Sequence, residues 1–174
     1  MSTIEEKLLN VQVVAATLDQ MPVIANLLEL YAYDFTEFWS FDIGDDGFYG
    51  YKDLPLYFSA PHRYPHIIFV NGKIAGLVMV QRGAPISEDP LRYDMAEFFI
   101  MRKFKRKGVG TFSALETFSR YVGPWQVRCL MENKTAHAFW KKTIERLQGF
   151  SPQQEEKVVN GELWTIFHFE SKSL

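Results

Sequence analysis

Residues 93–122 constrain the fold more than any other part of the chain, because a strand, a basic glycine loop and a helix follow one another there. Apolar and aromatic side chains dominate residues 93–101, as in a buried strand. Five of the six residues at 102–107 are basic, and Gly108 and Gly110 let the backbone turn sharply. Beyond this loop, apolar residues recur at helical spacing, at Val109, Phe112, Leu115, Phe118 and Val122. The succession indicates a domain in which helices pack on a central sheet.

The remaining patterns supply further strands and helices for such a domain. Thr17 and Gln20 have capping-box spacing ahead of a helix that reaches Tyr31. Two Asn-Gly pairs, at residues 71–72 and 160–161, predict hairpins with type I′ turns. The other expected elements are strands at 11–15, 66–70, 73–80, 93–101 and 125–131, helices at 109–122 and 136–147, and irregular structure at 35–59. Their order predicts an α/β (α+β) fold around a central mixed sheet.

Length, composition and charge favour one domain over residues 1–174 and argue against several classes of protein. Hydrophobic residues are 47% and charged residues 23%, unlike a disordered chain. The longest apolar run, Ile74–Val80, is far shorter than the ~20 residues of a membrane-spanning helix, so we expect no membrane contact. A net charge of −2 offers no general attraction for nucleic acid. The lone Cys129 and the lack of a targeting signal favour a cytoplasmic protein, and the sequence leaves a homodimer open.

The basic glycine loop has the composition of a phosphate-binding site. Gly108 and Gly110 bring backbone N–H groups together at the start of a helix, where the helix dipole favours an anion. The neighbouring lysines and Arg106 suit a ligand with more than one phosphate. No Walker loop occurs, and Ser113 replaces the third glycine of a dinucleotide fingerprint. A solvated turn, or a weak nucleic-acid contact made by the same cations, is the alternative interpretation.

The segment Lys105–Gly110 resembles the signature of the GNAT superfamily of N-acetyltransferases. That signature is Gln or Arg, two residues, Gly, one residue, and Gly or Ala, between the fourth strand and the third helix; here Lys105 takes the first place. The strand 97–101 and the run from Asn133 to Trp140 also follow the family's order. The resemblance covers most of the chain and implies a mixed, mostly antiparallel sheet of about six to seven strands, with helices on both faces.

The resemblance implies that acetyl-CoA is the acetyl donor and that no metal is needed. In the family, a strand edge pairs with the pantetheine arm, as unpaired strand N–H and C=O groups can. That edge corresponds here to Phe98, Phe99 and Ile100. The family loop that holds the pyrophosphate corresponds to Lys105, Arg106, Lys107, Gly108, Val109, Gly110 and Thr111. Asn133 matches a family asparagine that helps to hold the pantetheine arm.

The implied reaction is direct attack of an amine, from a small molecule or a peptide, on the acetyl thioester. A lysine-like amine is mostly protonated at pH 7, and its deprotonation there costs about 4.6 kcal/mol. We expect Glu97, on the strand beside the acetyl position, to act as the general base through water. The backbone N–H of Ile100 or of its neighbour is the candidate donor to the oxyanion. The alternative is that Glu97 is an ordinary carboxylate on the strand surface.

One position departs from the family pattern. Many members have a tyrosine after the phenylalanine of the fourth helix, where it can protonate the departing thiolate, but this chain has Trp140. An indole N–H cannot serve as that acid, although a thiolate can depart unprotonated at modest cost. His137 is a weaker candidate for the acid. Trp140 therefore motivates a second hypothesis, a non-catalytic domain that binds or senses acyl-CoA.

The segment 29–53 corresponds to the acceptor side of the family fold. It combines aromatic residues with seven acidic ones: Glu29, Asp34, Glu37, Asp42, Asp45, Asp46 and Asp53. Acidic and aromatic walls suit a cationic amine. We therefore expect Tyr31, Asp34 and Phe35 to contact the acceptor. The alternative is that the aromatic side chains belong to the core and the carboxylates are solvated.

Overall fold

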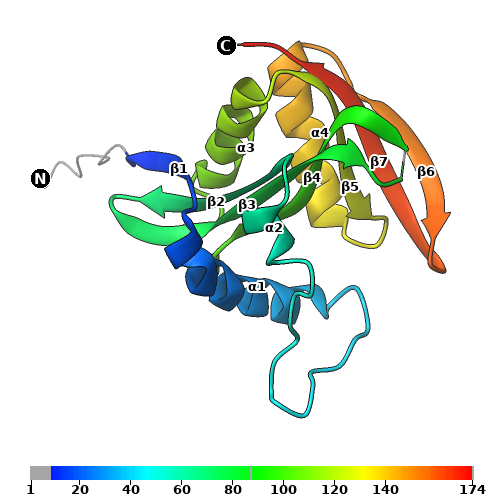
Figure 1. The fold of residues 1–174 in the computed structure, drawn as a ribbon. Helices are drawn as coiled ribbons and strands as arrows, with labels where there is room; N and C mark the ends of the chain where they lie inside the picture. The colour runs from blue at the N-terminus through cyan, green and yellow to red at the C-terminus, as the bar shows by residue number, and fades with distance from the viewer. Residues whose placement is uncertain (1–8, 87, 174) are drawn as a thin grey trace, which may run out of the picture.

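The computed structural model describes residues 9–86 and 88–173, which form a seven-stranded sheet with helices packed on both faces (Figure 1). The strands are β1 (Val11–Ala15), β2 (Arg63–Val70), β3 (Lys73–Ala84), β4 (Asp89–Ile100), β5 (Gly123–Leu130), β6 (Gln153–Val159) and β7 (Glu162–Ser171). The helices are α1 (Met21–Phe35), α2 (Leu56–Ser59), α3 (Val109–Arg120) and α4 (Lys134–Gln148), with 3₁₀ turns at Leu18–Gln20 and Arg102–Phe104. The expected fold class is confirmed.

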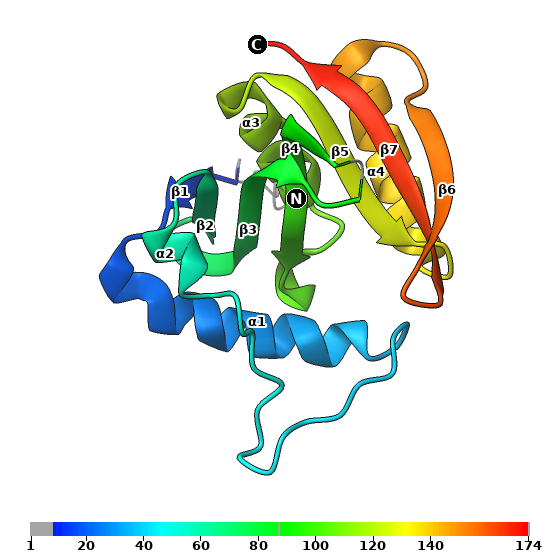
Figure 2. The same cartoon turned by 45° about the vertical axis from the view of Figure 1, so that its right-hand side comes forward.

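The sheet is mixed, and its one parallel contact is short. The strand order is β1-β2-β3-β4-β5-β7-β6, and every pair of neighbours is antiparallel except β4 and β5. Those two strands pair only where residues 93–95 meet residues 125–127. Figure 2 shows that β5 then curves away from β4 together with β7 and β6. The sheet therefore has an internal gap, and the second halves of β4 and β5 form its two walls.

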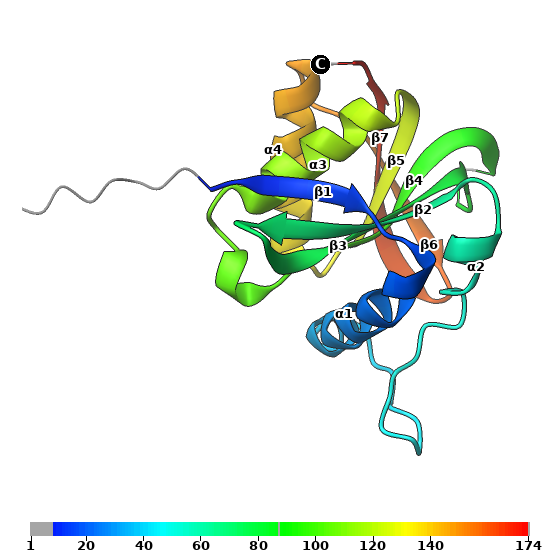
Figure 3. The ribbon, with the colours of Figure 1, turned by 60° about the vertical axis from the view of Figure 1, so that its left-hand side comes forward.

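Two apolar clusters hold the helices on opposite faces of the sheet, with α3 and α4 on one side and α1 on the other (Figure 3). The first lies between the sheet and α3 and α4, and includes Phe118, Trp125, Trp140, Ile144 and Phe167. The second lies between the sheet and α1 and α2, and includes Ile24, Leu27, Leu28, Tyr57 and Leu77. The apolar residues of β5 point into the first cluster, as their alternation with polar residues predicts.

Both Asn-Gly turns are confirmed, while the ends of several elements differ from the sequence expectation. Asn71 and Gly72 have positive φ angles between β2 and β3, as do Asn160 and Gly161 between β6 and β7. β3 and β4 extend further toward their shared turn than the patterns indicate, and β4 begins at Asp89. Register shifts interrupt the pairing of these two strands. Such irregularities break the two-residue alternation from which a strand is recognised.

The long segment between α1 and α2 is irregular, as expected, and α1 anchors it. The carboxylate of Glu29 accepts hydrogen bonds from the N–H groups of Tyr49 and Gly50, each at 2.8 Å. One acidic residue of the acceptor segment thus shapes the backbone of that same segment. Within the described ranges, the structure has no helix that is long and apolar enough to cross a bilayer.

Candidate active site

The loop after β4 gathers backbone N–H groups at the start of α3; we call residues 106–111 the amide cradle. None of these six N–H groups donates a hydrogen bond to another described residue. Arg106 (φ 59°) and Gly108 (φ 79°) adopt the left-handed conformation, which helps to turn successive N–H groups toward one side. The positive end of the α3 dipole lies at the same place. The amide cradle therefore suits a phosphate or a pyrophosphate.

Basic side chains surround the amide cradle, and an acidic residue of α1 holds two of them. Arg102 Nη2 lies 2.7 Å from one carboxylate oxygen of Asp34, and Lys105 Nζ lies 3.3 Å from the other. Asp34, which we expected to contact the acceptor, thus ties the last turn of α1 to the loop before α3. The other cations of the loop are exposed: Lys103, Arg106 and Lys107.

The gap between β4 and β5 opens next to the amide cradle. β4 pairs with β5 only as far as Met95, so among the described strands its edge beyond that residue has no partner on the β5 side. Phe98 faces α4, where its ring stacks on Phe139 at 5.8 Å. Phe99 faces α1, where its ring lies 5.8 Å from that of Tyr31. Among the described strands, the expected pantetheine edge is therefore an unpaired edge beside the amide cradle.

Glu97 lies on the α1 side of the gap. A β-bulge at Ala96 interrupts the alternation of β4 and turns Glu97 toward α1. The Tyr51 hydroxyl donates a hydrogen bond of 2.9 Å to the Glu97 carboxylate. The carboxyl group is recessed but partly accessible, and burial raises its pKa to about 7, against the opposing effects of Tyr51, Tyr31 and Arg128. A carboxyl group with this pKa can exchange a proton near neutral pH.

Three tyrosines from different elements surround Glu97. Tyr31 comes from α1, Tyr51 from the irregular segment and Tyr57 from α2. Burial, followed by the negative charge of Glu97, raises the pKa of all three phenols well above 10. The three hydroxyl groups therefore stay protonated; that of Tyr51 donates to Glu97, and that of Tyr57 donates to Gln81 Oε1 at 3.4 Å.

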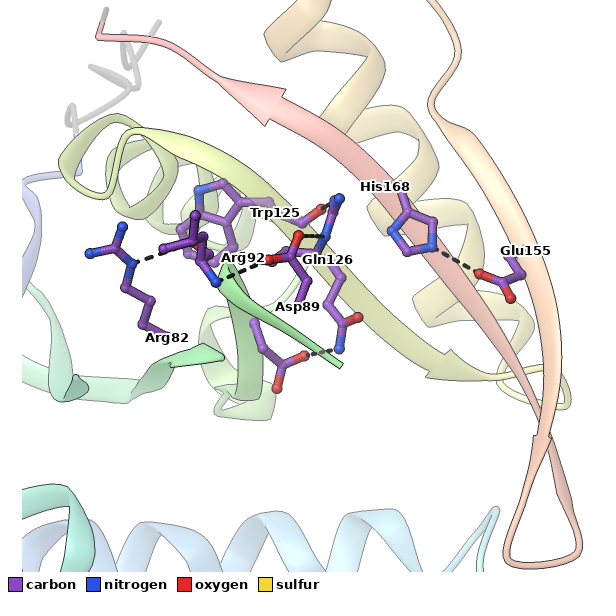
Figure 4. Close-up of polar contacts among 9 residues, drawn as sticks. Arg82, Asp89, Arg92, Trp125, Gln126, Glu155 and His168 are labelled. Carbon is purple, nitrogen blue, oxygen red and sulfur yellow. Dashed lines mark hydrogen bonds and ion pairs between the residues drawn. The ribbon is translucent and has the colours of Figure 1, made fainter. Parts of the chain in front are cut away.

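A buried ion pair lies beside Glu97 on the same face of the sheet. Asp94 is 0% exposed, and its two oxygens accept from Arg128 Nε at 2.9 Å and Nη2 at 2.8 Å. The amides of Gln126 and Gln81 donate to the same carboxylate at 2.8 and 3.0 Å; Figure 4 shows how Gln126 reaches out from β5. Sequence analysis missed this pair. The available signal was the alternation of β5, which places Gln126 and Arg128 on its less apolar face.

An aromatic row runs from α1 to β7 across the acceptor side. The ring of Phe35 lies 5.6 Å from Tyr31 and 6.2 Å from Trp39, and Trp39 lies 5.7 Å from Trp164. Tyr31 and Phe35 are the two aromatic residues that we expected on this side. Trp39 and Trp164 extend the row, and Trp164 comes from β7, far along the chain.

The remaining candidates occupy positions around α4. Asn133 Oδ1 accepts from the Ala136 N–H at 2.9 Å and so caps the helix, while its side-chain NH₂ group takes no part in the cap. Trp140 is buried, and its ring packs edge-on against Phe98 at 4.9 Å. The His137 ring points toward β6, where its Nε2 lies 3.1 Å from the side-chain oxygen of Gln154.

Among the described residues, no group of three or more His, Cys, Asp or Glu side chains is placed to hold a metal.

A family model described as the acetyltransferase (GNAT) family matches residues 24–144. This match spans more than half of the chain, which therefore belongs to the GNAT acetyltransferases, a family of acyltransferases that use acetyl-CoA. The resemblance to the GNAT family that the sequence indicated is confirmed, and the subgroup within that family is unresolved. No curated protein sequence matches the chain.

Solved structures support the same fold at low sequence identity. An acetyltransferase from Thermus thermophilus is 16% identical, with a TM-score of 0.64 over 92% of this chain and 96% of the other. RimL, an α-N-acetyltransferase of a ribosomal protein, solved with coenzyme A, is 14% identical, with a TM-score of 0.64 over 94% and 96%. A chimera of the Vibrio cholerae spermidine N-acetyltransferase SpeG with hSSAT is 14% identical, with a TM-score of 0.61 over 92% and 94%.

Proposed function

We propose that the chain transfers the acetyl group of acetyl-CoA to a primary amine of a small molecule or peptide, by direct attack of that amine. Acetyl-CoA supplies the activated acetyl group as a thioester. The observation that carries the proposal is Glu97, a recessed carboxyl group with a pKa of about 7 at the gap between β4 and β5. General bases work best when their pKa lies near the working pH.

Glu97 takes the proton that the amine must lose. At pH 7 a carboxyl group with this pKa is about half ionised, so a large share of the protein holds a competent base. The Tyr51 hydroxyl donates to this carboxylate and orients it. Desolvation of the amine in the recess lowers the amine pKa as well, which reduces the roughly 4.6 kcal/mol of deprotonation that the base must help to overcome.

The amide cradle and its exposed cations hold the pyrophosphate of coenzyme A in this proposal. Six N–H groups at the start of a helix, with no acceptor among the described residues, suit that dianion. The unpaired edge at residues 98–100 offers N–H and C=O groups to the amides of the pantetheine arm, and the Asn133 NH₂ group is a further donor. Asp34 acts indirectly, because it fixes Arg102 and Lys105 beside the cradle.

The acceptor enters from the α1 side, where Tyr31 and Phe35 line its path. Spermidine is the acceptor in the name of one structural neighbour, and a ribosomal protein in that of another. These two names bracket the range of amines to be tested, from small polyamines to protein termini. Asp34 has two cationic partners within the chain, so we infer that the wall which meets the acceptor is aromatic rather than acidic.

A non-catalytic acyl-CoA sensor is the second candidate function, and the buried Trp140 favours it because no acid stands at that position. A thiolate with a pKa of about 8.5 leaves without a proton donor at modest cost, so Trp140 is compatible with turnover.

Two measurements on the same protein separate these functions. Thermal unfolding with and without coenzyme A reports binding, and release of free thiol from acetyl-CoA over a panel of amines reports transfer. We expect stabilisation by coenzyme A and thiol release that depends on the amine. Stabilisation with no release on any amine supports the sensor. No stabilisation at all overturns the assignment of the amide cradle.

Glu97→Gln is the variant that tests the base. It should lower turnover strongly while leaving the affinity for coenzyme A unchanged, because the carboxylate lies on the acceptor side of the gap. The loss should shrink at high pH, where the amine is deprotonated by solvent. Equal turnover in wild type and variant across the pH range would remove Glu97 as the base.

A further inference from the structure

The acidic side chains on the acceptor side that lie nearest the gap have partners within the chain. Glu29 is engaged by two backbone N–H groups, and Asp34 by two cations of the loop. Asp94 is bound on both oxygens by Arg128. Glu97 therefore faces the gap opposite a guanidinium whose charge Asp94 balances. The Asp94–Arg128 pair therefore offers no net negative charge to a second ammonium group on the acceptor.

Arg128 has donors to spare for a ligand. A guanidinium carries five N–H donors, and the Asp94 carboxylate takes one from Nε and one from Nη2. Nη1 has no hydrogen-bond partner among the described residues, and the side chain is 20% exposed. Arg128 projects from the β5 wall of the gap, while Glu97 projects from the β4 wall on the same face. One wall thus presents a base and the other a cation with unused donors.

A second unused donor lies beside this guanidinium. Trp164 is only 9% exposed, and its indole N–H is buried with no hydrogen-bond partner among the described residues. The Arg128 guanidinium carbon lies 6.0 Å from the centre of the Trp164 ring system. Buried N–H groups are nearly always satisfied by protein, water or ligand. The unpaired indole N–H, on the ring that the guanidinium covers, therefore lacks an acceptor atom that a ligand could supply.

We propose that Arg128 and Trp164 form an anion subsite that binds a carboxylate on the acceptor, so that the substrate is an amino acid or a similar amino-carboxylate. This inference rests on the proposed acetyl transfer and names its substrate class. The guanidinium binds the carboxylate through its unused N–H groups, and the indole N–H adds one more bond. The amine of the same molecule then lies toward Glu97.

The size and charge of the subsite select a small monoanion. Arg128 and Glu97 lie one and two residues beyond Val127 and Met95, the last paired residues of β5 and β4, where the two strands begin to separate from a spacing of about 4.8 Å. A molecule with its amine and carboxylate on one carbon or a few carbons spans such a gap. Asp94 already balances the one cation of the cluster, so a dianionic phosphate would add a larger excess of negative charge beside Glu97 than a monoanionic carboxylate does.

Calorimetric titration of the protein saturated with coenzyme A tests the inference without any turnover. The ligands are glycine, alanine, leucine and phenylalanine, each paired with its own amide, and spermidine. We expect at least one amino acid to bind tenfold or more tightly than its amide, and spermidine to bind more weakly than that amino acid. Equal binding of every acid and amide, tighter binding of spermidine, or no binding of any amino acid overturns the inference.

Two variants connect that preference to the subsite. Trp164→Phe removes the unpaired N–H together with part of a buried ring system, so it should reduce the preference for the acid several-fold and also lower the melting temperature by a few degrees. The double variant Asp94→Asn with Arg128→Gln replaces the buried ion pair by a neutral pair and should abolish the preference. Arg82→Gln, an exposed arginine on β3, is the matched control and should change nothing.

Each outcome of the variants has a definite meaning. If the double variant does not fold, Trp164→Phe alone decides, and an unchanged preference in that variant overturns the inference. Thiol release with the same ligands keeps the two proposals apart. Selective binding of an amino acid without release would contradict acetyl transfer to that amine and leave the subsite standing. Thiol release with amines that carry no carboxylate, together with equal binding of acids and amides, would support acetyl transfer and overturn the subsite.

Discussion

Replacing Tyr51 by phenylalanine tests whether Glu97 acts as the base and whether its neighbours set its pKa. Burial raises the pKa of Glu97 to about 7, and the hydrogen bond from Tyr51 opposes that rise. A hydrogen bond to a charged group contributes about 1.5–3 kcal/mol, and one pKa unit corresponds to about 1.36 kcal/mol. Removing the Tyr51 hydroxyl while keeping its ring should therefore raise the pKa of Glu97 by roughly one to two units.

The sign of this shift fixes the expected pH profile. A higher pKa leaves less carboxylate at pH 7, so the ionised fraction falls from about a half to between a tenth and a hundredth, and turnover falls roughly five- to fifty-fold. Above about pH 10 Glu97 is ionised in both proteins, so the difference should disappear. The measurement is kcat/KM for thiol release between pH 5.5 and 10.

Tyr33→Phe is the matched control, because Tyr33 lies on α1 but is 64% exposed and has no contact with Glu97. Its profile should coincide with that of the wild type. An acidic limb that stays in place in Tyr51→Phe, or moves to lower pH, would refute the reasoning about Glu97. A uniform loss of activity at every pH would indicate a positioning effect of the Tyr51 ring instead.

Three further predictions concern the amide cradle, the β3–β4 contact and a buried histidine. Gly108→Asp should weaken coenzyme A binding at least tenfold, about 1.4 kcal/mol, in titration calorimetry. Gly161→Asp is the control, because Gly161 has a similar positive φ in a distant hairpin, and it should leave the affinity unchanged. Equal affinities of the two variants would contradict the proposal that the amide cradle binds coenzyme A. Gly76→Ala should destabilise the fold by about 3 kcal/mol in urea unfolding, because its Cβ would meet the Phe99 carbonyl oxygen; an unchanged midpoint would be inconsistent with the β3–β4 register. Burial, followed by the charge of Arg120, lowers the pKa of His66 to about 4, so stability should fall as the pH drops from 6.5 toward 4, by up to about 3 kcal/mol. His66→Gln should show a smaller fall, and an identical one would rule His66 out as its source.

The strands and helices with strong local signals could be predicted from the sequence. The two Asn-Gly turns fix both hairpins because few other residues adopt two successive positive φ angles. The glycine loop and the helix after it are likewise set by local backbone chemistry at Gly108, which has a positive φ, whereas Gly110 leaves room for the Phe139 ring of α4. The order of elements and the fold class follow from these features and from hydrophobic periodicity.

The acceptor side could be predicted only in part, because its contacts join residues that are distant in sequence. Asp34 belongs to an acidic segment, and nothing local indicates that Arg102 and Lys105 bind it. The Asp94–Arg128 pair joins two strands through a parallel contact, which no short pattern reports. Trp164 comes from the last hairpin and reaches the site only because β7 pairs with β5. Long-range pairing therefore decides which polar groups meet.

One extra residue in β4 accounts for the position of Glu97, the proposed base, at the gap. Up to Met95, alternate residues of β4 face α3 and α4, and continued alternation would send Glu97 to that same face. The bulge at Ala96 reverses the alternation, so Glu97 faces α1 and Phe98 takes its place toward α4. The ladder between β4 and β5 ends at the same point, which opens the gap. In the proposed reaction, an acetyl donor on the α3 side and an amine on the α1 side can meet only where that ladder is absent, and Glu97 lies two residues beyond Met95, the last paired residue of β4.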